Sequence, residues 1–107
     1  MDIDKFKRIT KQLYKKVIDE FDKIDPDEAE ANYHLDNISI TFGDGTIFVI
    51  NRQPPVYQLW LATKSKGYHF LYNDDSGKWL STKTNEEFYL VLKTHADPYL
   101  SSSLNFN

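Results

Sequence analysis

The chain has 107 residues, enough for one domain with one hydrophobic core and too few for two. It contains no cysteine, which excludes disulfide bonds, thiolate zinc sites and an iron–sulfur cluster held by this chain's own thiolates. The formal net charge of −3 argues against a general nucleic-acid binder, and no apolar run approaches the about 20 residues that cross a bilayer.

Residues 3–24 are expected to form an amphipathic helix. Apolar side chains recur every three or four residues in this stretch and make one continuous stripe. Asp2 or Asp4 can cap the start of the helix. Asp25-Pro26 is expected to end it, because the residue before a proline avoids the helical region. The stripe consists of Phe6, Ile9, Leu13, Val17, Phe21 and Ile24.

The end of this helix and the loop after it form an acidic segment, residues 19–30. The segment holds seven acids and one base, a net charge of −6, whereas the other 95 residues sum to +3. Acids in the last turns of a helix oppose the helix dipole by roughly a few tenths of a kcal/mol each, so helix stability does not explain their position. The seven acids are Asp19, Glu20, Asp22, Asp25, Asp27, Glu28 and Glu30.

From residue 33 to residue 80 apolar and polar side chains alternate, a pattern typical of strands. Short turns separate the strands, for example the glycine-containing turn at residues 43–45, and this predicts an antiparallel meander. The Pro54-Pro55 pair is expected to interrupt strand pairing and bend the chain. The expected strands are residues 38–42, 46–51, 56–63, 67–72 and 78–80.

A second helix is expected at residues 85–97. Thr84, followed three residues later by Glu87, has the pattern of a capping box, and Pro98 is expected to stop the helix. Its apolar stripe consists of Phe88, Val91, Leu92 and His95.

Two helices flanking a meander predict an α+β fold. The architecture is a two-layer α/β sandwich, in which an antiparallel sheet of five to seven strands carries two helices on one face. The whole chain, residues 1–107, is expected to be a single domain. In the C-terminal tail, residues 98–107, Leu104 and Phe106 either pack against the helices or fray with the tail.

One stretch resembles the signature of the frataxin family: residues 50–62, Ile-Asn-Arg-Gln-Pro-Pro-Val-Tyr-Gln-Leu-Trp-Leu-Ala. The Gly-Tyr-His-Phe run at residues 67–70 resembles the bacterial branch, and the order of elements is similar over nearly the whole chain. The resemblance implies a frataxin-like sandwich that binds Fe²⁺ and Fe³⁺ through surface carboxylates. It also implies docking on the cysteine desulfurase of the iron–sulfur machinery, where bacterial members slow cluster synthesis in an iron-responsive way.

The seven acids of the acidic segment are the candidate metal ligands. Ferric iron is a hard cation that suits exposed carboxylates, and Asp19 and Asp22 lie on one helix face. Open carboxylates are expected to bind iron weakly and to accept other divalent or trivalent cations. The alternative is an acidic run that is only a solvated surface. His34 could add one nitrogen ligand, whereas His69 and His95 are expected to be structural.

The exposed face of the sheet is the candidate partner-binding surface. Leu59 and Leu61 share one face of their strand, so Trp60 faces solvent if the leucines face the helices. An exposed tryptophan beside amide side chains is a candidate hot spot for a protein partner. The alternative places Trp60 in the core. The candidate partner-binding residues are Asn51, Gln53, Gln58 and Trp60.

Three functions remain open at this stage. The favoured one is a regulator that docks on the cysteine desulfurase, followed by an iron chaperone that delivers iron to the cluster scaffold protein. A ferroxidase is less favoured, because the paired Glu-x-x-His motifs of di-iron bundles and a nucleophile with an adjacent base are absent. We expect a non-enzymatic cytoplasmic protein, monomeric without iron, with no nucleic-acid or membrane partner.

Overall fold

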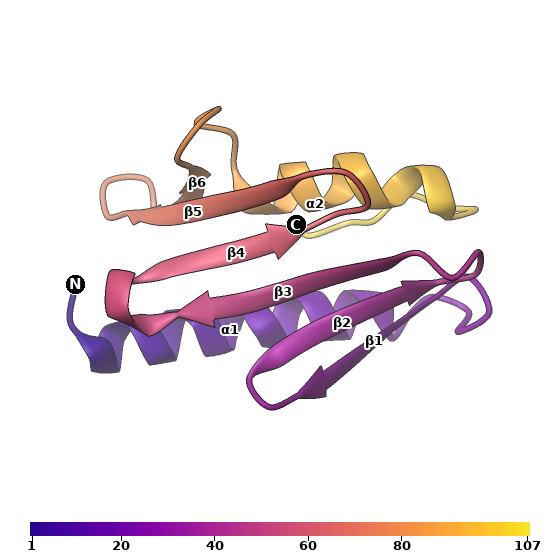
Figure 1. Cartoon of the computed structure of the whole chain (residues 1–107), viewed down its shortest axis with the longest axis horizontal. Helices are drawn as coiled ribbons and strands as arrows, with labels where there is room; N and C mark the ends of the chain where they lie inside the picture. Colours follow the sequence, from indigo (N-terminus) through magenta and orange to yellow (C-terminus); the bar gives the residue numbers. More distant parts are fainter.

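The computed structural model describes all 107 residues and consists of two helices and a six-stranded antiparallel sheet. The strands lie in the sheet in chain order, and both helices pack on one face of it, which confirms the predicted α+β sandwich (Figure 1). The elements are α1 (Ile3–Phe21), β1 (Ala29–His34), β2 (Asn37–Phe42), β3 (Ile47–Gln53), β4 (Gln58–Ala62), β5 (Gly67–Asn73), β6 (Lys78–Ser81) and α2 (Phe88–Ala96).

The hydrophobic core lies between the sheet and the two helices. Every second side chain of the central strands is fully or almost fully buried, as expected for a sheet covered on one face. The predicted apolar stripe is confirmed within α1, where Ile9 is partly buried, and Ile24 packs partly buried beyond the end of the helix. The largest core side chains are Phe6, Phe21, Phe48, Phe70, Phe88 and Leu92.

Helix α1 ends at Phe21, three residues before the predicted end. The N–H groups of Lys23 and Ile24 donate to carbonyls three residues back, at 3.2 and 3.0 Å, so the chain tightens before Pro26 is reached. Asp2 caps the start by accepting the N–H of Lys5 at 2.8 Å. The structure contains no helix with the length and apolar character needed to cross a membrane.

Strand β1 begins at Ala29, earlier than the predicted start of the sheet, and pairs with β2 from Ala29 opposite Phe42 to His34 opposite Asn37. It is an edge strand, and Ala29 is its only buried residue. Its apolar alternation is therefore weak, which is why the pattern did not reveal it. Leu35 and Asp36, with φ angles of 48° and 71°, form the left-handed turn that leads into β2.

The predicted capping box of the second helix is wrong. Helix α2 begins at Phe88, and its N-cap is Glu87, whose carboxylate accepts the N–H groups of Tyr89 and Leu90. Thr84 lies in a turn before the helix, where its N–H donates to the Ser81 hydroxyl at 3.2 Å. Because Glu87 accepts the free N–H groups at the start of the helix, Thr84 is not needed as a cap.

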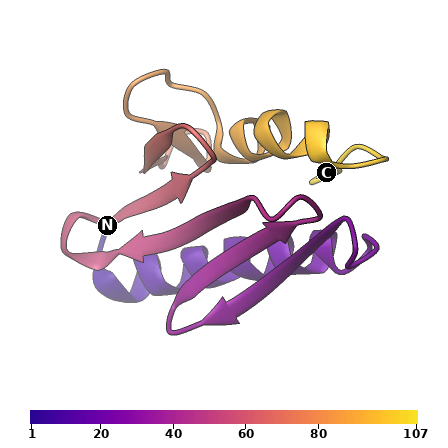
Figure 2. The same cartoon turned by 45° about the vertical axis from the view of Figure 1, so that its right-hand side comes forward.

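The C-terminal tail packs against the body of the protein, which decides between the two alternatives. Leu104 is only 3% exposed, and the ring of Phe106 stacks on Tyr89 with centroids 4.8 Å apart. Figures 1 and 2 both show the tail turning back beside α2. The tail therefore belongs to the folded domain.

Candidate functional site

The seven acids of the acidic segment occupy two kinds of environment. The carboxylates of Asp22, Asp27 and Glu30 are exposed and make no hydrogen bond or ion pair, and that of Asp25 only accepts the N–H of Asp27 at 2.9 Å. Asp22, Asp25 and Asp27 lie between α1 and β1, and Glu30 is the second residue of β1. They form an open, negatively charged surface.

The other three acids already have partners. Asp19 forms an ion pair with Lys15 at 2.6 Å, and the hydrogen bond from the ammonium group raises the pKa of Lys15. Glu20 is 9% exposed and accepts the N–H of Asn105 at 2.6 Å. Glu28 accepts the N–H and the hydroxyl of Ser101, at 2.6 and 2.9 Å. Two of the candidate ligands therefore fasten the C-terminal tail.

These side chains do not form a preorganised metal centre. Nowhere in the structure do three or more His, Asp or Glu side chains come together in a group able to hold a metal ion. His34 lies at the far end of β1 from Ala29, about 16 Å along a strand that rises about 3.3 Å per residue. It is therefore too remote to assist the acids that precede the strand.

The sheet face turned away from the helices carries the other candidate site. Leu59 and Leu61 are fully buried while their neighbours on β4 are half-buried, so the predicted alternation is confirmed. Trp60 lies opposite Asn51 on β3 and opposite His69 on β5. Gln53 on β3 lies opposite Gln58 on β4, two positions along the strands from the Asn51–Trp60 pair. The structure thus brings all four candidate partner-binding residues together.

Trp60 is half-buried because its indole lies across β5. A Cβ atom on Gly67 would lie 3.1 Å from the indole nitrogen, which is closer than ordinary van der Waals contact. Glycine at this position lets the ring approach the neighbouring strand, so β5 covers part of the indole. His69, which we expected to be structural, is exposed and extends this surface.

The side-chain oxygen of Asn51 is buried beside Trp60 and accepts no hydrogen bond. A buried acceptor without a donor costs about 1–3 kcal/mol. The sequence signal for Asn51 was its place in the signature, and its unsatisfied oxygen became visible only from the structure.

His95 has the structural role predicted for it. The Tyr68 hydroxyl lies 2.8 Å from the Nε2 atom of His95, and the two rings pack with centroids 5.4 Å apart. Burial, and secondly the charge of Lys66, hold the pKa of His95 below its ordinary value of 6.5. This histidine is therefore a packed, neutral side chain at neutral pH.

Comparisons with known proteins agree with this fold. A family model described as a frataxin-like domain matches residues 1–102. The iron–sulfur cluster assembly protein CyaY from Photobacterium profundum is 37% identical over 70 residues, which are 65% of this chain and 65% of that protein. The aligned stretch thus spans just under two thirds of that relative.

Two solved structures are also similar. A frataxin from Psychromonas ingrahamii, used as a model for stability within the CyaY family, has a TM-score of 0.89 at 27% identity and covers 100% of this chain and 99% of that one. Trimeric frataxin from the yeast Saccharomyces cerevisiae, in a ferrous complex, has a TM-score of 0.71 at 20% identity, with coverage of 91% and 86%. The second likeness supports the fold alone.

Proposed function

This chain belongs to the frataxin-like family, and on that basis we propose that it acts in iron–sulfur cluster assembly as an iron-binding regulator that docks on the cysteine desulfurase. The observation that carries the proposal is the presence of two separate open surfaces. One is the acidic segment, and the other is the row formed by Asn51, Trp60 and His69 on the sheet.

The acidic segment supports electrostatic docking on a basic partner. Four exposed carboxylates without an ion pair lie close together in the chain, in a segment of net charge −6. Such a surface attracts a positively charged groove over a distance of about one Debye length, about 8 Å at physiological ionic strength. The affinity should therefore fall as salt is added.

Iron bound to the same carboxylates would change this attraction. One Fe²⁺ ion reduces the segment's charge of −6 to −4, and one Fe³⁺ ion reduces it to −3. Iron and the desulfurase then use overlapping surfaces, so iron availability alters docking. This gives a physical basis for iron-responsive regulation without any catalytic step.

The row on the sheet supports a second contact with the assembly machinery, such as the cluster scaffold protein. An indole held against Gly67 loses little side-chain entropy when a partner covers it. This feature favours a protein contact over a small-molecule site.

An iron chaperone is the second candidate. Carboxylates that do not gather in a group of three release a cation readily, which suits delivery of iron to the scaffold. A ferroxidase is less well supported, because that chemistry needs a preorganised pair of metal sites. We propose on these grounds that the chain is not an enzyme.

Amide spectra of ¹⁵N-labelled protein with a bacterial cysteine desulfurase test the proposal. Signals from residues 19–30 and from the surroundings of Trp60 should broaden with the desulfurase and recover as salt is added. D22N/D27N should weaken this effect. D4N/D75N, which changes net charge equally at exposed positions outside both surfaces, should leave it intact.

The opposite outcome is equally informative. If the desulfurase leaves every signal unchanged while Fe²⁺ still broadens residues 19–30, docking on the desulfurase is wrong for this chain. The iron-chaperone function then takes its place.

A further inference from the structure

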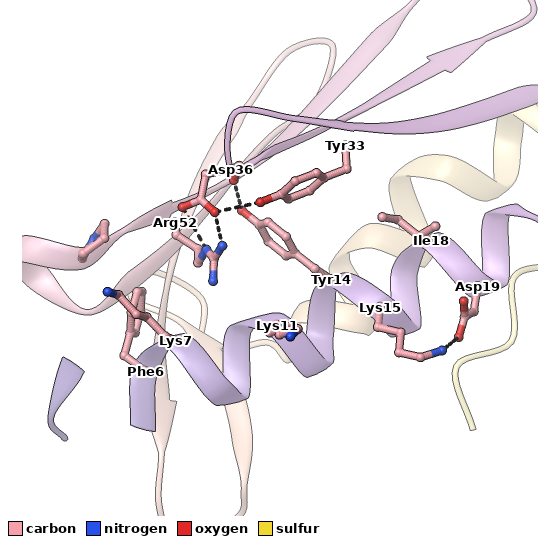
Figure 3. A pocket seen from close by; sticks show the side chains of 11 residues that line it. Phe6, Lys7, Lys11, Tyr14, Lys15, Ile18, Asp19, Tyr33, Asp36 and Arg52 are labelled. Atoms are coloured by element: carbon pink, nitrogen blue, oxygen red, sulfur yellow. Dashed lines mark hydrogen bonds and ion pairs between the residues drawn. The ribbon is translucent and has the colours of Figure 1, made fainter. Parts of the chain in front are cut away.

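A groove of about 870 Å³ runs between α1 and the part of the sheet where the β1–β2 hairpin meets the end of β3. Figure 3 shows α1 along one side of it, with Tyr33, Asp36 and Arg52 on the side of the sheet. This groove is separate from the Asn51–Trp60 row. It touches the acidic segment only at Asp19.

The groove has an apolar floor. Phe6, Tyr14 and Ile18 of α1 line it, and Tyr33 of β1 closes it from the sheet. Tyr33 packs edge-on against Tyr14, with centroids 6.1 Å apart, yet it remains 54% exposed. An aromatic ring this exposed beside buried apolar side chains offers a stacking surface to a ligand.

The rim of the groove is positively charged. Four bases and two acids line it, a net charge of +2 in a chain of net charge −3. Lys15 is paired with Asp19, and Arg52 is paired with Asp36 and donates to the Thr10 hydroxyl at 3.1 Å. The remaining two bases, Lys7 and Lys11, form no ion pair or side-chain hydrogen bond.

The two free lysines lie one helical turn apart on the same side of α1. This spacing of about 6 Å lets both ammonium groups reach a single anionic group. Arg52 is already neutralised by Asp36, and its side chain is only 13% exposed. Lys7 and Lys11 are therefore the cations left for a ligand.

We propose that this groove binds a small anionic ligand with a flat apolar body. Its ring packs against Tyr33, and its anionic group is held by Lys7 and Lys11. The volume lies within the range of about 300–1,000 Å³ typical of small-molecule sites, and such sites combine an apolar lining with a few convergent polar groups. The positive rim selects an anion, in contrast to the cation-binding chemistry of the acidic segment.

Titration with 1-anilinonaphthalene-8-sulfonate, an anionic aromatic probe, tests this site. The amide signals of Tyr33 and Asp36 should shift with the probe. K7Q/K11Q should lower the affinity about tenfold, because two charge contacts are lost. K64Q/K83Q removes the same charge from exposed positions outside the groove and should bind within twofold of the unaltered chain.

A neutral analogue, N-phenyl-1-naphthylamine, separates charge from apolar contact. It should bind more weakly, and K7Q/K11Q should not change its affinity. Thermal unfolding of both double variants checks that they remain folded. The proposal is overturned if the sulfonate probe does not bind, if it shifts signals around Trp60 instead, or if both double variants bind it equally. It also fails if a poly-glutamate peptide occupies the groove and the probe does not.

Discussion

The carboxylate of Glu20 accepts a hydrogen bond from the backbone N–H of Asn105, at 2.6 Å, across 85 positions of the chain. Glu28 does the same for Ser101, 73 positions away. Together they hold the C-terminal tail against the end of α1 and the start of β1. Any cation that bound Glu20 or Glu28 would compete with these bonds, so iron binding at either carboxylate would be coupled to packing of the tail.

Replacing Glu20 with alanine should destabilise the fold. The side chain is 9% exposed, and its loss leaves the Asn105 N–H without its acceptor. We expect the free energy of unfolding to fall by about 1–3 kcal/mol in urea denaturation. Asp22→Ala, at an exposed acid two positions away, should change it by less than about 0.5 kcal/mol. Equal effects of the two substitutions would show that the tail bond contributes nothing.

Replacing Gly67 with alanine should displace the indole of Trp60. The new Cβ would lie 3.1 Å from the indole nitrogen, so the ring must shift. We expect the indole N–H signal of Trp60 to move in the ¹⁵N spectrum and binding to the assembly machinery to weaken. Ser65→Ala, in the exposed turn just before β5, is the control and should leave both unchanged. An unmoved indole signal in Gly67→Ala would contradict this account of the packing.

The stability of the protein should fall when the pH drops below about 6.5, and His95 is one cause. Burial and the nearby charge of Lys66 hold the folded pKa of His95 below its ordinary value of 6.5. The unfolded chain therefore takes up the proton first, and the stabilisation is complete above pH 6.5 and lost as the pH falls through the folded pKa.

Urea unfolding at pH 7.5 and 5.5 measures this dependence. His95→Gln should show a smaller loss of stability between the two pH values than the unaltered chain. His34→Gln, at an exposed position, is the matched control and should behave like the unaltered chain. An unchanged pH dependence in His95→Gln would remove His95 from the explanation.

The sequence predicted the fold well where the signal was local. The alternation of Leu59 and Leu61 with their neighbours favoured the open face for Trp60 over the core, because strand parity is strict. It failed at β1, where an edge strand has little apolar alternation to detect. The sequence also predicted the wrong helix cap. Thr84 and Glu87 have the spacing of a capping box, and only the structure shows that Glu87 is the residue that caps α2.

The roles of single acids within the candidate site were not predictable from the sequence. Glu20 and Glu28 look like their exposed neighbours in an acidic run, and only the return of the tail distinguishes them. The groove beside Tyr33 was not predictable from the sequence for a similar reason. Its two walls are contributed by α1 and by the β1–β2 hairpin, and no local pattern records their approach.

Asp97 joins the end of α2 to the tail. Its carboxylate accepts the N–H of Leu104 at 3.0 Å, the ammonium of Lys93 at 2.6 Å and the hydroxyl of Ser103 at 2.7 Å. Burial opposes its charged form, but these hydrogen bonds together outweigh burial and hold the pKa of Asp97 below its ordinary value of 3.8. The stabilisation is therefore present above pH 3.8 and lost as the pH falls through the folded pKa.

Asp97→Asn should lower the free energy of unfolding at pH 7 by about 1–2 kcal/mol, because charged acceptors make the stronger hydrogen bonds. The same variant should lose part of the acid sensitivity of the unaltered chain between pH 5 and pH 3. Asp75→Asn, at an exposed position in the β5–β6 turn, should do neither. Amide exchange locates the effect, since Leu104 should lose protection in Asp97→Asn while the core strands keep theirs. A uniform loss of protection would instead mean that the tail and the sheet unfold as one unit.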